Sequence, residues 1–203
     1  MMGAGVWLGG NGLAVGAFDG TAGHHEAATG IPMEDRMKSL QDAFEHTLRD
    51  IYYAENALTK ALPKMAAATQ SADLKAAFEA HLADTKGQVA ILKDVFKLLG
   101  QKAEGEKCDA IEGLIKETEG IIEEAEGQAL DACLIGAAQA VEHYEIARYG
   151  TLREWAKALG HTEAHDLLTR ILDQEKAANA KLTTLAVTEV NKPGTRSRAT
   201  AKA

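Results

Sequence analysis

Apolar residues recur every three or four positions along most of the chain, a spacing that places them on one face of an α-helix. The pattern predicts five helices, with approximate bounds at residues 35–70, 72–99, 108–125, 128–159 and 162–190. Ser71 precedes the second helix as an N-cap, and Gly100 and Gly160 follow the second and fourth helices as terminating residues. The sequence therefore indicates an all-α fold.

Polar residues interrupt the apolar faces of the four long helices. In the first helix, Glu55 falls on the same face as Ile51 and Leu58. An unpaired carboxylate on a buried face is costly, so one such residue needs an explanation and several need a common one. The other interrupting residues are His81 and Asp84, Glu142 and Glu145, and Glu175. On the second helix, either Asp84 or Thr85 continues the face from His81 to Gln88.

All of these polar residues lie within a turn of the midpoint of their helix. In an antiparallel bundle of helices of similar length the midpoints lie at one level, so the side chains are expected to converge in one layer. Several carboxylates cannot share a dry layer as bare anions, because each needs a proton or a cation. Carboxylates with an imidazole suit two bridged first-row metal ions, and the alternative is pairing with each other or with Arg148 and Lys176.

The connections between the predicted helices favour one bundle topology. The first and second helices are joined tightly, as are the fourth and fifth, whereas about 28 residues containing the short helix join the second to the fourth. Its roughly 17 helical residues cover about 25 Å, and the flanking loops complete a crossover along the bundle. We therefore expect a ferritin-like four-helix bundle with a long crossover that contains the shorter fifth helix.

The two ends of the chain differ from the middle. Residues 1–33 hold nine of the 19 glycines, which disfavours helix, and they lack the features of a signal peptide. This extension is either a weakly ordered arm or a segment upstream of a true start at Met33 or Met37, and we place it outside the fold in both cases. The bundle is expected over residues 34–191, and residues 192–203 are expected to form a flexible basic tail.

The composition narrows the class of function. Hydrophobic residues make up 46% and charged residues 26%, which is typical of a soluble globular domain, and no apolar run is long enough to span a membrane. The net charge of −8 argues against general nucleic-acid binding and leaves only the basic tail as a weak candidate. Two cysteines are too few for a disulfide framework, so a cytoplasmic location is expected.

Several segments together resemble the YciE/YciF family of ferritin-like bacterial stress proteins. The resemblance covers about residues 37–190. It is carried by LRDIYYAENALTKALPKM (48–65), FEAHLADTKGQVAIL (78–92), KCDAIEGLIKE (107–117), QAVEHYEIARYGTL (139–152) and LDQEK (172–176). The resemblance implies a homodimeric helical bundle with a dinuclear metal centre and a link to stress conditions.

Carried over to this chain, the family implies two iron ions, with manganese as the alternative. Their ligands would be Glu55, His81, Asp84, Glu142, Glu145 and Glu175. We expect Gln88, His143 and Tyr149 in a second layer around them, with a surface position as the alternative for His143. Ferritin-like proteins commonly offer two Glu-x-x-His motifs. Here the second helix has the reversed order, His81-x-x-Asp84, and the last helix has Ala178 where a histidine would lie.

The expected function is that of a di-iron protein in a stress response, acting in iron oxidation or peroxide handling. The small-molecule substrate would be O2 or peroxide. The alternative is a non-enzymatic stress or assembly module whose oligomeric surface is the function. A cage-forming iron store is a third and weaker candidate.

Overall fold

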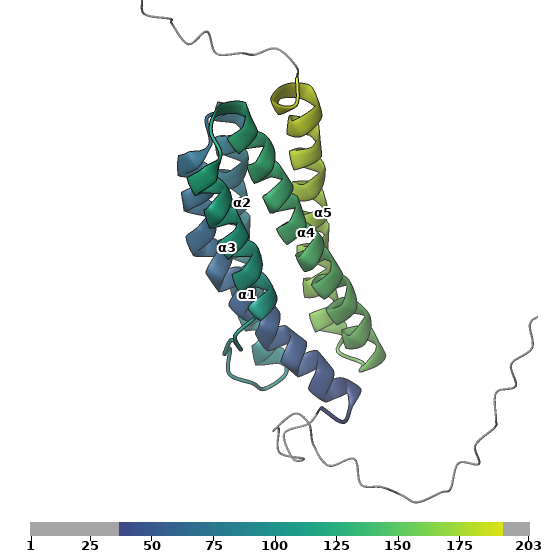
Figure 1. The fold of residues 1–203 in the computed structure, drawn as a ribbon. Helices are drawn as coiled ribbons and strands as arrows, with labels where there is room; N and C mark the ends of the chain where they lie inside the picture. Colours follow the sequence, from purple (N-terminus) through teal and green to yellow (C-terminus); the bar gives the residue numbers. More distant parts are fainter. Residues whose placement is uncertain (1–36, 193–203) are drawn as a thin grey trace, which may run out of the picture. The chain divides into compact units, whose positions relative to one another are not determined.

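In the computed structural model of the protein, residues 37–192 are described, and they are almost entirely helical (Figure 1). The expected N-terminal extension and the tail from residue 193 lie outside the described residues. The elements are α1 (Leu40–Ala68), α2 (Ala72–Leu98), α3 (Asp109–Glu124), α4 (Gly127–Ala158), α5 (Thr162–Leu185) and the π-helical turn η2 (Ala186–Val190). The predicted all-α fold is confirmed for this part of the chain.

Local capping fixes where the helices begin and end. α2, α3 and α4 begin and end within one residue of their predicted bounds, whereas α1 begins later than predicted. The cause is a capping box at its start. The Ser39 hydroxyl accepts a hydrogen bond from the Asp42 backbone N–H at 3.1 Å, and the Asp42 carboxylate accepts one from the Ser39 N–H at 2.9 Å. Gly100 and Gly160 follow α2 and α4 with φ of +69° and +79°, which favours glycine.

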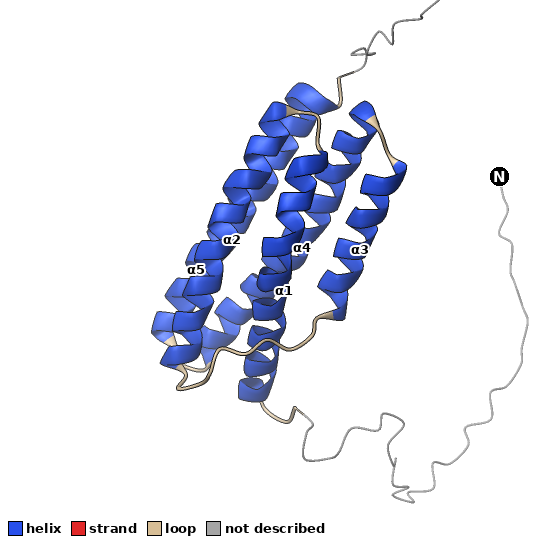
Figure 2. Cartoon of the chain, turned by 90° about the vertical axis from the view of Figure 1, so that its left-hand side faces the viewer, coloured by secondary structure: helices blue, strands red, loops and turns tan. Residues whose placement is uncertain are grey.

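The four long helices pack as two antiparallel pairs. α1 packs on α2, and α4 packs on α5. Contacts between α2 and α5 and between α1 and α4 join the two pairs into one bundle. α3 lies on the outside against α1 and α4 and forms the expected crossover (Figure 2). This topology brings the midpoints of all four long helices to one level. Among the described helices, none is both long and apolar enough to cross a lipid bilayer.

The loop that leads into the crossover lies directly against α1. A Cβ atom added at Gly105 would approach the Cβ and Cα atoms of Tyr53 to 3.1 and 3.2 Å. The next residue, Glu106, donates its backbone N–H to the carbonyl oxygen of Arg49 at 3.2 Å. A larger residue at position 105 would require the loop or Tyr53 to shift by a few tenths of an ångström, so glycine favours this close approach of the crossover to α1.

One buried carboxylate ties the other end of the bundle together. Asp131, on α4, accepts hydrogen bonds from the Thr69 hydroxyl at 2.5 Å and from the backbone N–H groups of Gln70 and Ser71 at 2.9 Å each. The three donors belong to the turn between α1 and α2. Asp131 therefore holds that turn against the start of α4, far from the middle of the bundle.

We expect Asp131→Ala to lower the free energy of unfolding by about 1–3 kcal/mol, because it leaves these donors without their anionic acceptor. Asp94→Ala, at an exposed position of α2, is the matched control and should change stability little. Urea unfolding of the two variants beside the wild type measures the difference. Equal stabilities for both variants would contradict the role given to Asp131.

Candidate metal centre

Each of the four long helices places at least one polar side chain inside the bundle at its middle. Glu55 comes from α1, His81 from α2, Glu142 and Glu145 from α4, and Glu175 from α5. The four glutamates are at most 2% exposed, and the His81 side chain is 11% exposed. The layer predicted from the sequence is therefore present, with apolar residues of the same helix faces on either side of it.

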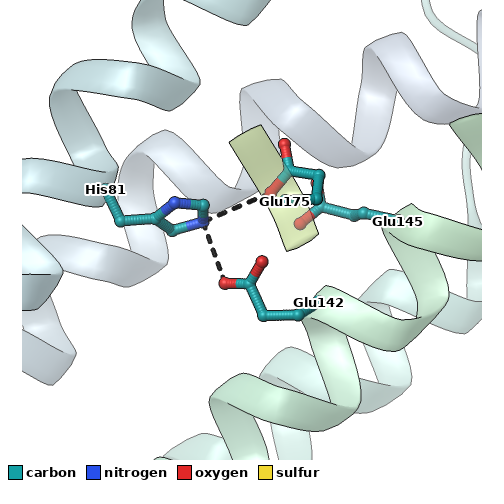
Figure 3. Close-up of side chains that lie close together, drawn as sticks. All are labelled: His81, Glu142, Glu145 and Glu175. Atoms are coloured by element: carbon teal, nitrogen blue, oxygen red, sulfur yellow. Dashed lines mark ion pairs between the residues drawn. The ribbon is translucent and has the colours of Figure 1, made fainter. Parts of the chain in front are cut away.

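Four of these residues form a tight cluster (Figure 3). One ligand atom each from His81, Glu142, Glu145 and Glu175 lies within 4.8 Å of the others. His81 Nε2 lies 3.2 Å from Glu142 Oε1 and 4.0 Å from Glu175 Oε2, so the imidazole faces two of the carboxylates at once. Glu142 and Glu145 are three residues apart, and this spacing puts both on the inner face of α4.

Glu55 adjoins the cluster from the α1 side. Its Oε1 accepts a hydrogen bond from the hydroxyl of Tyr149, which is itself fully buried, and its Oε2 has no hydrogen-bond partner in the described part of the chain. The Glu55 charge contributes to raising the pKa of Glu142 and of Glu145, so the three carboxyl groups interact directly. Glu55 is outside the group of four atoms within 4.8 Å, but it belongs to the same buried layer.

Two further polar residues support the layer from α2. Gln88 Nε2 donates to Glu175 Oε1 at 2.5 Å and so fixes the orientation of that carboxylate. Thr85 is fully buried, and its hydroxyl donates to the backbone carbonyl of His81 at 2.9 Å. Of the two residues left open by the sequence pattern, Thr85 is the one that continues the buried face of α2.

Asp84 and His143 lie outside the buried cluster. Asp84 is exposed, although its charge acts on the pKa of both His81 and Glu175. His143 is also exposed, and its Nδ1 lies 2.7 Å from the carbonyl oxygen of Gln139. It follows Glu142 by one residue, or about 100° around the helix, which turns it to the surface. The structure thus places His143 in the alternative position that the sequence allowed, and Asp84 at the outer edge of the site.

Burial sets the ionisation of the carboxyl groups when no metal is bound. It raises the pKa of Glu55 and of Glu145 well above the ordinary value, and neighbouring carboxylates add to the effect. The pKa of Glu142 rises to about 10 because of burial, the Glu175 charge and a hydrogen bond to Glu175. Burial also raises the pKa of Glu175, to about 7, while hydrogen bonds from Glu142 and Gln88 oppose the rise.

The cationic side chains named by the alternative do not neutralise this layer. Arg148 Nε lies 3.5 Å from Asp50 Oδ2, and its guanidinium lies over the ring of Tyr144 at 5.1 Å. Lys176 is exposed. Asp50 also accepts a hydrogen bond from the Tyr144 hydroxyl at 2.6 Å, and Cys108 Sγ lies 3.0 Å from the same hydroxyl. The sequence pattern does not predict this neighbouring network, because residues 50, 108 and 144 belong to three different helical segments with no common spacing.

Unpaired oxygen atoms show what the layer lacks. Five buried carboxylate oxygens have no hydrogen-bond partner within residues 37–192: Glu55 Oε2, Glu142 Oε2, Glu175 Oε2 and both oxygens of Glu145. A buried polar atom without a partner is destabilising, more so when it carries charge. Carboxylate oxygens and an imidazole nitrogen are ligands for iron, manganese and zinc ions, so the donor set fits a metal centre.

The raised pKa values give the metal-free protein a definite pH dependence. An unfolded glutamate ionises near pH 4.5, whereas folded Glu142 does so near pH 10. Between these values the folded state holds a proton that the unfolded state releases, so stability must fall as the pH rises. Glu55 and Glu145 act in the same direction, while the pKa of Glu175 limits its contribution to below about pH 7.

We therefore expect the free energy of unfolding of the metal-free protein to decrease between pH 7 and pH 9. Glu142→Gln, which cannot titrate, should show a smaller decrease, and Glu79→Gln, at an exposed position of α2, should retain the wild-type slope. Urea unfolding at several pH values in the presence of a chelator measures the three slopes. A stability that is flat or rises over this range would contradict the assignment.

Similar proteins share both the sequence and the fold. The chain is 48% identical to protein YciF of Escherichia coli strain K12 over 158 residues, which cover 77% of this chain and 95% of that protein. The crystal structure of the E. coli stress protein YciF superposes with a TM-score of 0.74 and covers 77% of this chain and 99% of that structure.

Two other solved structures are similar. The YcfI protein of Rhodopseudomonas palustris, provisionally described as a structural protein, is 52% identical with a TM-score of 0.71, covering 72% of this chain and 94% of that chain. A protein of Xanthomonas campestris is 23% identical with a TM-score of 0.57, covering 72% and 90%, and shows the fold alone. The family model described as "Domain of unknown function (DUF892)" matches residues 39–193. This chain is therefore a member of that family, and its 48% identity over most of both chains makes it a relative of YciF.

Proposed function

We propose that this protein acts in a stress response through a dinuclear metal centre, most readily of iron, with manganese as the alternative. The observation that carries the proposal is the set of five unpaired carboxylate oxygens beside one imidazole, in a layer that no lysine or arginine among the described residues neutralises. The similarity to a stress protein supports the physiological setting.

Five residues of this layer would hold the ions. Glu142, Glu145, Glu175 and His81 form the cluster, and Glu55 would complete it from α1. Asp84, also predicted as a ligand, lies at the exposed edge and would act through its charge. Burial lowers the pKa of His81, which favours the neutral imidazole that a metal ion requires. For Nε2 to bind a metal, the imidazole proton must lie on Nδ1.

The supporting residues would orient the ligands and control protons. Tyr149 holds Glu55, and Gln88 holds Glu175, each through a hydrogen bond to one carboxylate oxygen that leaves the other available. Metal binding would release the proton that Glu142 retains at neutral pH. Two Fe(II) ions would supply two electrons, which with two protons reduce O2 to hydrogen peroxide or hydrogen peroxide to two waters.

The second candidate is a non-enzymatic module whose oligomeric surface is the function. The provisional description of YcfI as a structural protein favours it. In this case the buried carboxyl groups would remain protonated, and no metal would bind. The homodimer implied by the family resemblance is compatible with both candidates. A cytoplasmic location also belongs to the proposal, since both cysteines are free thiols and Fe(II) persists in a reducing compartment.

Metal binding separates the two candidates. We expect anaerobically reconstituted protein to retain about two Fe(II) ions per chain and to melt at a higher temperature than the metal-free protein, because a ligand that binds the folded state stabilises it. Glu145→Gln and Glu175→Gln should lose at least one ion each, while Glu79→Gln should match the wild type. Elemental analysis after gel filtration gives the stoichiometry, and calorimetry gives the melting temperature.

A folded wild-type protein that retains neither iron nor manganese, with an unchanged melting temperature, would contradict the metal centre and favour the structural module. Light scattering on the same samples gives the oligomeric state. A mass equal to twice that of the chain agrees with the homodimer, and a much larger mass would indicate a cage.

Residues around the metal ligands should affect metal affinity more at buried positions than at exposed positions. We expect Tyr149→Phe and Gln88→Leu to weaken metal binding about 10- to 100-fold, because groups that orient metal ligands typically have effects of this size. Asp84→Asn and His143→Gln, outside the buried layer, should change the affinity much less. Competition with a metal-binding dye measures all four. Equal losses at exposed and buried positions would contradict the arrangement.

A further inference from the structure

An apolar cavity of about 40 Å³ lies beside the metal cluster. All four long helices contribute to its wall, with Leu58 from α1, Phe78 from α2, Val141 from α4 and Leu182 from α5. His81 and Glu142, which belong to the cluster, also line the cavity. A space inside this bundle therefore adjoins the proposed metal ligands, and Lys181 is the one further polar residue in its lining.

Small residues account for the space. Ala77, Ala138 and Ala178 line the cavity at positions where larger side chains would fill it. Ala178 follows Glu175 by three residues, the place at which a Glu-x-x-His motif would put a histidine. Ala178 therefore removes one possible histidine ligand and at the same time leaves space beside the remaining ligands.

The cavity adjoins a groove on the outside of the bundle. A groove of about 560 Å³ runs between α2 and α5, and it shares Ala77, His81, Ala178 and Lys181 with the cavity. Asp73, Asp84 and Gln174 make the groove more polar than the cavity. A small molecule that enters the groove would pass between the two shared alanines and reach the face of His81.

Size and polarity decide which molecules the cavity favours. One water occupies about 10–15 Å³ on this scale, so there is room for a molecule of a few heavy atoms. A bound water requires two to four polar partners. The polar side chains of the wall are His81, Glu142 and Lys181, and Lys181 is an exposed residue that also lines the groove. Hydrogen peroxide would lose hydrogen bonds to solvent on entering, whereas an apolar diatomic molecule loses none.

We propose that this cavity is a binding site for one small apolar molecule of the dioxygen class, which it holds against His81 and Glu142, and that the groove between α2 and α5 is its entrance. The binding site follows from the cavity alone. The role of the cavity in oxidation rests on the proposed metal centre. It makes that proposal more specific, because an apolar cavity would deliver dioxygen rather than peroxide to the cluster.

Xenon is the probe for the binding site, since it is apolar, of suitable size and independent of bound metal. Crystals of the metal-free protein pressurised with xenon should show a xenon atom in the cavity. Ala138→Leu, which fills the cavity without touching the groove, should abolish it, and Ala147→Leu, exposed on the same helix, should not. An absence of xenon from the wild-type cavity would overturn the proposal.

The second readout is the oxidation rate of bound Fe(II) in a stopped-flow instrument. Ala138→Leu should slow oxidation by O2 at least tenfold and change oxidation by hydrogen peroxide less than twofold, with Ala147→Leu like the wild type. If Ala138→Leu does not fold, Ala178→Leu, with exposed Ala180→Leu as its control, blocks the same space from α5. Equal effects on both oxidants, or none, would overturn the selection of dioxygen.

The proposed metal centre and the proposed dioxygen site can be tested independently of each other. A protein that binds xenon in the cavity but retains no metal would contradict the proposed metal centre and support the binding site. A protein that retains two metal ions but takes up no xenon would support the metal centre and overturn the binding site.

Discussion

Carboxyl groups inside a helical bundle must be protonated or must bind cations, and the rest of this structure depends on that constraint. Four glutamates at most 2% exposed converge from three helices, and none of them pairs with a lysine or an arginine of residues 37–192. Burial raises the pKa of each, and nearby carboxylates add to the rise, so the metal-free layer favours protonated carboxyl groups. The unpaired oxygens are the places where a divalent cation would replace those protons. The apolar parts of the helices supply the stability that allows such a layer to persist.

The residues around the layer are arranged to orient the carboxylates for a metal ion rather than to neutralise them with cationic side chains. Tyr149 and Gln88 each occupy a single oxygen of a buried carboxylate, while Arg148 is directed to Asp50 instead. On the α2 and α5 side, alanines at positions 77 and 178 leave a cavity and a groove that lead to His81. Tyr149 and Gln88 thus orient two of the carboxylates, while the small residues leave space beside His81.

Helical periodicity was enough to predict the bundle and most of the buried layer. Glu55, Glu142, Glu145 and Glu175 each fall on an apolar face, and the single long connection identified the crossover. Periodicity does not separate neighbouring positions near the edge of a face, which is why Asp84 and Thr85 could not be distinguished until α2 was packed against α5. Asp131 was not predicted because its partners in the turn at residues 69–71 are about 60 residues away in the sequence. The cavity was equally hidden, since it results from alanines on three helices that the sequence does not connect.

The most direct test of the central claim is the position of metal ions in crystals of the protein loaded with Fe(II) without oxygen, located by anomalous scattering at the iron absorption edge. We expect two peaks inside the bundle, each within bonding distance of carboxylate oxygens from Glu55, Glu142, Glu145 or Glu175, with His81 Nε2 bound to one of them. Peaks confined to exposed carboxylates, or no peak in a protein with intact buried residues, would contradict it.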